Sequence, residues 1–201
     1  MKLFYSGASP YVRKVMVLAH ETGLADRIEL VPASVAPTLV NAVVAAENPL
    51  VKVPTLLLTD GQSLFDSRVI VEYLDTLHSG RRLFPAEGAA RWAALRRQAI
   101  GDGLLDAALL IRYENNLRPE PQRWKEWTEG QFRKLRQALA ALAAEPLGTE
   151  PTIGEITAGC ALGYLDFRFP EEDWRAAHPS LASWFARISE RPSFVATKPK
   201  A

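Results

Sequence analysis

The segment from Tyr5 to Val15 constrains the fold of this chain more than any other stretch. The apolar residues 1–5 predict a short strand, and Gly7 predicts a turn after it. Pro10 suits the first turn of a helix, and the apolar positions beyond it recur at the spacing of one buried helix face: Val12, Val15, Met16 and Ala19. Ser9 is therefore expected where a strand passes into a helix N-terminus. Unpaired N–H groups and the helix dipole favour an anion at such a place, for example a thiolate.

Strand and helix patterns alternate through residues 1–79. Asp60-Gly61 is a hairpin turn signal, and Asp66-Ser67 offers a cap for the helix that follows it. The expected order is β-α-β-(α)-β-β-α, with the later elements over 27–32 (strand), 35–47 (ambiguous, a short helix), 55–58 and 62–65 (strands) and from 67 (helix).

Only helical patterns follow residue 89. They predict a long helix over 89–116, a helix opened by Pro119 and Pro121, a break at 145–148, a capping box at Thr152–Glu155 and a last helix around Trp184. The sequence therefore predicts an α/β N-terminal domain over 1–79, a linker over 80–88 and an all-α helical domain over 89–201.

Composition excludes several classes of function. A formal charge of +1 gives no electrostatic reason to expect nucleic acid or an anionic membrane as a partner, and no apolar run is long enough to cross a bilayer. The single cysteine, Cys160, rules out an intrachain disulfide, and the 3 histidines lack metal-ligand spacing. We expect a cytoplasmic protein without a bound transition metal.

Two further motifs each allow a structural and a functional interpretation. Pro54 either starts a strand as an ordinary trans proline or, if the Val53–Pro54 bond is cis, exposes the backbone of Val53 to an extended peptide. Asp66 and Ser67 either cap a helix and bind nothing, or use the same cap to hold an α-amino acid head group. In the second case Ser67 binds the carboxylate and Asp66 the ammonium.

Ser9-Pro10-Tyr11, Val53-Pro54 and Asp66-Ser67, in this order and spacing, resemble the thioredoxin-like N-terminal domain of the glutathione transferases. The segment from Thr152 to Arg168 resembles the capping box and buried sixth helix of that family's C-terminal domain, with Glu155 where the family usually has aspartate. The resemblance covers nearly the whole chain and is strongest to bacterial members of the YibF type.

The resemblance implies a site for glutathione as co-substrate. Val53 would bond the cysteinyl backbone, with Pro54 cis, and Asp66 and Ser67 would hold the γ-glutamyl end. Lys52 would neutralise the glycine carboxylate or would simply be a solvated surface lysine. Ser9 would donate a hydrogen bond to the sulfur and favour the thiolate.

The implied activity is glutathione transfer to a small electrophile or reduction of a peroxide, in detoxification and in a homodimer. Alternatives are a non-enzymatic module with the same fold and a glutathione-dependent oxidoreductase, which is disfavoured because Ser9 replaces the cysteine that such enzymes use. Cys160 is expected to be buried, and Tyr5 or Tyr11 are rivals to Ser9. The helical domain would line the electrophile site, with candidate residues Leu105, Leu109, Arg112, Tyr113 and Trp174.

Overall fold

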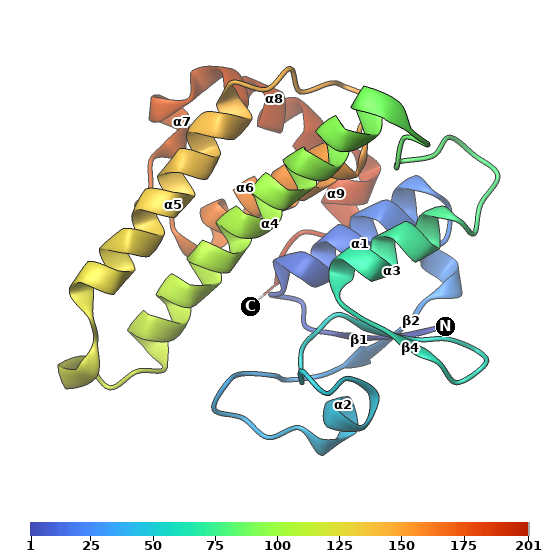
Figure 1. Cartoon of the computed structure of the whole chain (residues 1–201), viewed down its shortest axis with the longest axis horizontal. Coiled ribbons are helices and arrows are strands. Elements are labelled where there is room, and N and C mark those ends of the chain that lie inside the picture. The colour runs from blue at the N-terminus through green and yellow to red at the C-terminus, as the bar shows by residue number, and fades with distance from the viewer. Residues whose placement is uncertain (201) are drawn as a thin grey trace. The chain divides into compact units, whose positions relative to one another are not determined.

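The computed structural model describes residues 1–200 and divides into two compact units. One unit comprises Met1–Ala86 together with the C-terminal segment from Arg191, and the other comprises Glu87–Glu190. Figure 1 shows the strands in the first unit and the long helices in the second.

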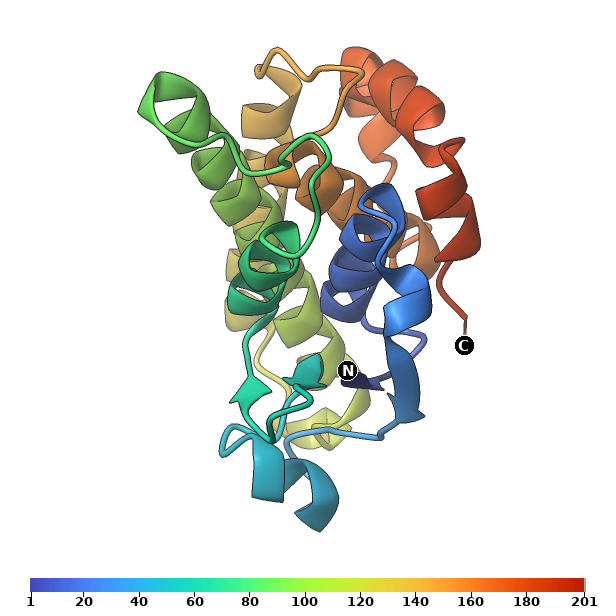
Figure 2. The ribbon, with the colours of Figure 1, turned by 90° about the vertical axis from the view of Figure 1, so that its right-hand side faces the viewer.

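The first unit is a four-stranded mixed sheet flanked by helices. Its elements are β1 (Lys2–Tyr5), α1 (Pro10–Glu21), β2 (Glu29–Pro32), α2 (Ala42–Glu47), β3 (Thr55–Leu57), β4 (Ser63–Leu64) and α3 (Ser67–Asp75). The strand order is β2-β1-β3-β4; β1 is parallel to β2 and antiparallel to β3, which is antiparallel to β4. Figures 1 and 2 show α1 and α3 on one side of the sheet and α2 on the other.

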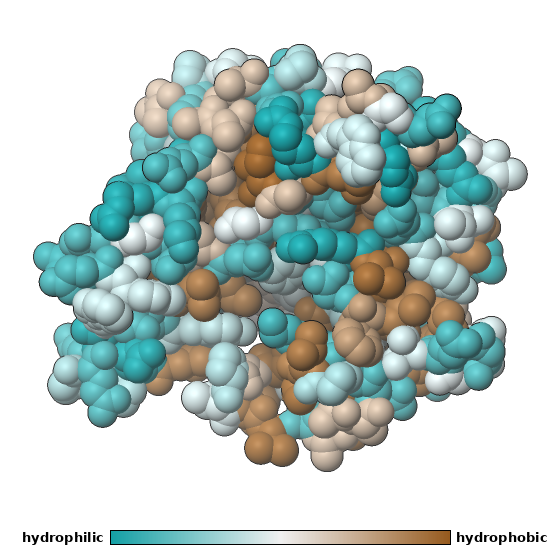
Figure 3. Space-filling view, in the orientation of Figure 1, coloured by the Kyte–Doolittle hydropathy of each residue, from teal (hydrophilic) through white to brown (hydrophobic). Residues whose placement is uncertain are grey.

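This arrangement confirms the predicted βαβαββα order. The second strand begins later than predicted because Ala25–Arg27 form a 3-10 turn before it. Within the ambiguous stretch only Ala42–Glu47 is helical, and Asn41 caps it by accepting the N–H of Val44 at 3.0 Å. Hydrophobic side chains remain exposed around this helix, in the lower part of Figure 3: Leu39, Val40, Val43 and Leu50.

The second unit is all helical and consists of α4 (Gly88–Asn116), α5 (Lys125–Ala143), α6 (Ile153–Arg168), α7 (Trp174–Ala177) and α8 (Pro179–Ser189). Its centre is α6, which is buried from Ile153 to Leu165. The predicted capping box is confirmed: Thr152 accepts the N–H of Gly154 at 3.2 Å, and Glu155 accepts the N–H of Thr152 at 2.9 Å. Glutamate therefore serves in this cap where the related family usually has aspartate.

Two glycines let α4 and α6 approach closely. A Cβ on Gly101 would lie 2.9 Å from Cγ2 of Thr157, and a Cβ on Gly154 would lie 2.9 Å from the carbonyl oxygen of Ala94. Both distances are shorter than ordinary van der Waals contact, so the backbones meet where a side chain has no room. The two contacts also show that α4 and α6 run in the same direction.

The start of α5 differs from the prediction. Pro119 and Pro121 belong to a 3-10 turn at its approach, and α5 itself begins at Lys125. Trp124 is the residue before the helix, and its N–H is satisfied by Oε1 of Glu114 at 2.8 Å. The short helix α7 was not predicted, since four residues are too few to show a helical period.

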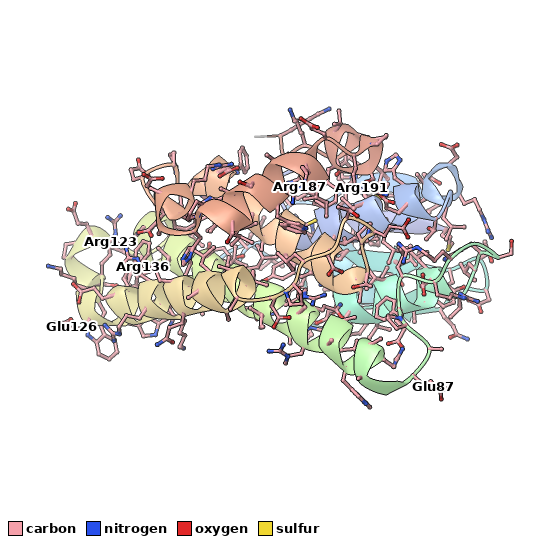
Figure 4. All side chains as sticks on the ribbon, turned by 90° about the horizontal axis from the view of Figure 1, so that it is seen from above. Glu87, Arg123, Glu126, Arg136, Arg187 and Arg191 are labelled. Carbon is pink, nitrogen blue, oxygen red and sulfur yellow. The ribbon has the colours of Figure 1, made fainter. Side chains whose placement is uncertain are left out.

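The C-terminal segment also differs from the prediction, because it belongs to the first unit rather than to the helical domain expected over 89–201. Its helix α9 (Pro192–Ala196) packs against α1. Arg191, labelled in Figure 4, donates from Nε and Nη2 to the two carboxylate oxygens of Glu21 at 2.9 and 2.7 Å. Farther along, Arg13 donates to the carbonyl of Phe194 at 3.3 Å, and the N–H of Lys200 donates to the carbonyl of Gly7 at 3.2 Å.

Glu21 is the acceptor on which this docking depends. Partial burial acts to raise its pKa, but the hydrogen bonds from Arg191 and Ser193 and the charge of Arg191 outweigh burial, so the pKa of Glu21 lies below its ordinary 4.5. A carboxyl group whose pKa is lowered on folding stabilises the folded state above its unfolded pKa. That stabilisation is lost as the pH falls below 4.5 and through the folded value.

We therefore predict that Glu21→Gln lowers the free energy of unfolding at neutral pH by about 2 kcal/mol, because one side of a charged bidentate pair is lost. The difference from wild type should shrink as the pH falls below 4.5, where the wild-type carboxyl also becomes neutral. Urea unfolding at several pH values measures both effects. The control is Glu29→Gln, which removes an exposed pair with Lys2 at 3.8 Å and should change stability little. If the difference in the free energy of unfolding between wild type and Glu21→Gln stays constant down to low pH, the charge of Glu21 does not have this role.

Candidate functional site

Three loops meet at one end of the sheet. Phe4 lies opposite Thr55 in the β1–β3 pair, and Leu56 lies opposite Leu64 in the β3–β4 pair. Because both pairs are antiparallel, the ends of β1 and β4 share an edge with the start of β3. Ser9, Val53 and Asp66 lie on the loops that leave or enter the sheet at this edge, and the helices that follow the first and third loops, α1 and α3, pack against each other.

Ser9 is the N-cap of α1. Its N–H donates to the carbonyl of Ser6 at 3.0 Å, which closes the turn after β1, and its Oγ accepts the N–H of Val12 at 3.3 Å. A hydroxyl has one hydrogen to donate, and within residues 1–200 the hydrogen of Ser9 has no acceptor. The half-buried Ser9 therefore holds its oxygen in place with one bond and keeps its donor available.

Val53 lies in a tight loop between α2 and β3. The Val53–Pro54 peptide bond is cis, as the family resemblance implies, and the Phe65–Asp66 bond is cis as well. Neither the N–H nor the C=O of Val53 makes a hydrogen bond to any residue of the described chain. This backbone can therefore pair with an extended peptide.

Asn48 is the polar residue that organises this loop, and its role was not predicted from the sequence. It is 1% exposed; its Nδ2 donates to Oγ1 of Thr55 at 2.9 Å and to the carbonyl of Lys52 at 3.2 Å, and its Oδ1 accepts the N–H of Leu50 at 2.9 Å. Val51, within the same loop, has φ of 50°, a conformation that is costly for a β-branched residue. The Asn48-Pro49 dipeptide is a turn signal, and it is the sequence feature that could have predicted this loop.

Asp66 and Ser67 begin α3. Asp66 is exposed and caps the helix by accepting the N–H of Arg68 at 2.9 Å through Oδ1. Ser67 is 3% exposed, yet its hydroxyl has no partner among residues 1–200. The cap predicted from the sequence is thus confirmed, and it leaves a carboxylate oxygen, a hydroxyl and the first N–H groups of a helix at the same place.

The remaining predicted residues differ in how accessible they are. Lys52 is exposed, which suits both of its predicted interpretations. Cys160 is fully buried in α6, as predicted. Tyr5 lies in β1 and Tyr11 in the first turn of α1, both half-buried.

The residues considered for the electrophile all lie in the helical unit. Leu105 is fully buried, and Trp174 is 3% exposed with its indole N–H bonded to Asp166 at 3.0 Å, so both belong to the core. Leu109, Arg112 and Tyr113 are half-buried and remain candidates.

The polar groups at the sheet edge have the character of a peptide-binding site rather than of a metal-ligand cluster. Between Met1 and Lys200 no three His, Cys, Asp or Glu side chains gather as metal ligands. The same residues contain no helix that is long and apolar enough to span a membrane. The polar groups left over at the sheet edge are the hydroxyl of Ser9, the backbone of Val53, the carboxylate of Asp66 and the hydroxyl of Ser67, which match an extended peptide with a charged amino acid head group.

A thioredoxin-like βαβαββα domain followed by an all-helical domain defines the glutathione S-transferase fold. Residues 8–77 match the family's N-terminal domain and residues 125–187 its C-terminal domain. The chain is also 31% identical over 206 residues to the uncharacterized GST-like protein YibF of Escherichia coli (strain K12), covering 99% of this chain and 98% of YibF. The chain therefore belongs to the glutathione S-transferase family.

Solved structures extend the comparison. A glutathione transferase family member from Pseudomonas fluorescens Pf-5 with bound glutathione has 49% identity and a TM-score of 0.98, covering 100% of this chain and 99% of that one. A second structure of the same family member, with bound S-(propanoic acid)-glutathione, has 48% identity and a TM-score of 0.93, covering 100% of both chains.

The cap at Asp66 leads to a prediction about stability. Asp66→Ala should lower the free energy of unfolding by about 1 kcal/mol, because the N–H of Arg68 loses its acceptor. Asp66→Asn should leave stability nearly unchanged, because the asparagine oxygen caps a helix equally well. Chemical denaturation of the two variants measures this difference. Equal losses in both variants would show that the charge, rather than the cap, stabilises α3.

Proposed function

We propose that this protein is a glutathione transferase that activates the thiol of glutathione for attack on a small electrophile or a peroxide. The observation that carries the proposal is the hydroxyl of Ser9, fixed by the N–H of Val12 at 3.3 Å while its own hydrogen remains free to donate. A thiolate is a suitable acceptor for that hydrogen, and the N-terminus of α1 adds the favourable end of a helix dipole.

Glutathione would bind along the sheet edge. We propose that the free backbone of Val53 pairs with its cysteinyl residue, and that Asp66 and Ser67 hold the ammonium and carboxylate of the γ-glutamyl end. Lys52 would neutralise the glycine carboxylate. The bound glutathione in a relative that is 49% identical over the whole chain supports glutathione as the ligand.

The chemistry follows from the stabilised thiolate. In conjugation the sulfur forms a bond to an electrophilic carbon, the thiol proton passes to solvent, and the electron pair leaves with a leaving group or moves into the electrophile. In peroxide reduction the sulfur bonds to the terminal oxygen as the O–O bond breaks, which gives a sulfenic acid, and the alkoxide leaves with the electron pair and takes a proton to become an alcohol. The thiol of a second glutathione then attacks the sulfenic sulfur and yields the disulfide and water. Each unit by which the thiol pKa falls corresponds to about 1.4 kcal/mol, so one charge-assisted hydrogen bond and a helix N-terminus supply one to two units.

The bound S-(propanoic acid)-glutathione in a relative that is 48% identical favours conjugation, because that molecule is a thioether of glutathione. The alternative of a non-enzymatic module is opposed by the unpartnered polar groups at Ser9, Val53 and Ser67, which a site without a ligand does not need. A glutathione-dependent oxidoreductase would need a nucleophilic cysteine, and Cys160 is buried. The cytoplasmic location, the homodimer and the role in detoxification stay predictions.

Glutathione binding tests the site directly. Calorimetric titration of the wild type with glutathione should give saturable heat, and Asp66→Asn should raise the dissociation constant about tenfold because a charged hydrogen bond to the ammonium is lost. Ser67→Ala should also raise the dissociation constant of glutathione about tenfold, because the γ-glutamyl carboxylate loses a hydrogen bond. Asp60→Asn, which makes the same charge change in the hairpin turn of this unit, is the matched control. The absence of heat at millimolar glutathione would refute the proposal.

The role of Ser9 is tested by kinetics. Ser9→Ala should lower kcat for conjugation to 1-chloro-2,4-dinitrobenzene about tenfold to a hundredfold, with little change in glutathione affinity, because only the thiolate loses its donor. Ser9→Thr keeps the hydroxyl and the helix cap and should restore most of the rate. An unchanged rate in Ser9→Ala would transfer the role to Tyr5 or Tyr11.

A further inference from the structure

The C-terminal ends of α4 and α6 bring two arginines together inside the helical unit. The contacts of Ala94 with Gly154 and of Gly101 with Thr157 set a parallel register between these helices, which lie side by side in Figures 1 and 2. Arg112 lies near the C-terminal end of α4, Arg168 is the final residue of α6, and the charge of Arg112 acts on Arg168.

Neither arginine has the carboxylate partner that five other arginines of the same unit have. The paired arginines each meet a carboxylate: Arg96, Arg97, Arg118, Arg136 and Arg175. Neither Arg112 nor Arg168 forms an ion pair or a hydrogen bond with any residue from 1 to 200. The Nε of Arg168 is buried without an acceptor, while its guanidinium lies 3.9 Å from the ring centroid of Phe167.

Two tyrosines complete the cluster: the charge of Arg112 acts on its chain neighbour Tyr113, and the charges of both arginines act on Tyr164. Tyr164 is 3% exposed, and neither tyrosine hydroxyl has a hydrogen-bond partner in the described chain. The four residues thus present two guanidinium groups and two hydroxyls, all of them able to donate hydrogen bonds.

The electrostatics of the cluster are suited to binding an anion. Burial lowers the pKa of Arg168, and the positive charge of Arg112 lowers it further. Burial also raises the pKa values of Tyr113 and Tyr164, so both hydroxyls stay protonated at neutral pH. Two cations brought together in a partly desolvated place without a counter-ion favour any anion that can reach them.

We propose that Arg112 and Arg168, with the hydroxyls of Tyr113 and Tyr164, form a binding site for the carboxylate of the second substrate. The inference rests on the proposed function and narrows its substrate class to electrophiles that bear an anionic group. A guanidinium suits this task because its planar fork matches the two oxygens of a carboxylate. A neutral aromatic electrophile would leave both arginines without a counter-ion.

A matched pair of substrates tests the proposal in the full-length protein. With 4-chloro-3-nitrobenzoate the glutathione sulfur bonds to the ring carbon that bears chlorine, and chloride leaves with the electron pair of the C–Cl bond. The neutral 4-chloro-3-nitrobenzamide reacts in the same way. For each substrate kcat/KM is divided by the uncatalysed rate constant with free glutathione, which removes the difference in intrinsic reactivity.

The expected result is a loss of charge preference in the variants. Arg112→Gln and Arg168→Gln should each lower the corrected kcat/KM for the benzoate about tenfold, with the benzamide and the dissociation constant of glutathione unchanged. Arg133→Gln removes an exposed positive charge from α5 and should leave both substrates unaffected. An unchanged benzoate-to-benzamide ratio, an equal loss on both substrates, or weakened glutathione binding instead would overturn the proposal.

Direct binding separates this inference from the proposed function. Calorimetric titration with the unreactive 3-nitrobenzoate, without glutathione, should give saturable binding to the wild type that is lost in the double variant Arg112→Gln/Arg168→Gln. Circular dichroism and thermal unfolding establish that the variant is folded. If the protein conjugates neither substrate but binds 3-nitrobenzoate through these arginines, the proposed function fails and the anion site stands. If the wild type does not bind 3-nitrobenzoate, the anion site is refuted whatever the conjugation assay gives.

Discussion

The antiparallel pairing of β1 with β3 is the constraint on which the candidate site depends. Its register, with Phe4 opposite Thr55, places the end of the first strand beside the loop that contains Val53. The pairing of β3 with β4 then brings the start of α3 to the same edge. A slip of one residue would turn the buried face of each strand toward solvent, so burial of Leu3 and Leu56 protects the geometry of the site as well as the core.

The loops at this edge are held from several directions. Ser9 and Asp66 cap the helices that follow them, and the buried amide of Asn48 ties down the segment that leads to Val53. The C-terminal segment returns to the same unit, where Arg191 binds the end of α1 and Lys200 bonds to Gly7 near its start. Rigid support of this kind matters because a hydrogen bond to a thiolate is effective only if its donor is already in position.

The helical unit contains arginines that are paired with carboxylates and arginines that are not. Buried Arg97 is neutralised by Glu145 and Glu155, which joins the capping box of α6 to α4, and this pairing offsets part of the cost of burying the ions. Arg112 and Arg168 lie on the same two helices and have no such partner among residues 1–200. Two like charges close together and partly buried repel each other, and a ligand that supplies an anion offsets that repulsion.

The local sequence determined most of the elements. Helix caps at Ser9, Asp66 and Thr152 and the hairpin signal at Asp60-Gly61 identify the ends of helices and strands, because capping and turn formation depend on neighbouring residues alone. The buried position of Cys160 followed from the apolar face around it. The approach to α5 and the short helix α7 were not predictable in this way, since prolines allow a 3-10 turn as readily as a helix start and four residues show no period.

Only the tertiary structure decided which polar groups stay without partners. No local pattern reveals that the hydrogen of Ser9 and the backbone of Val53 remain available, because that depends on every other donor and acceptor nearby. The return of the C-terminal segment to α1 and the charge interaction between Arg112 and Arg168 link residues far apart in the chain. Sequence determines local conformation through neighbours, whereas burial, pairing and the lack of pairing arise when distant segments pack together.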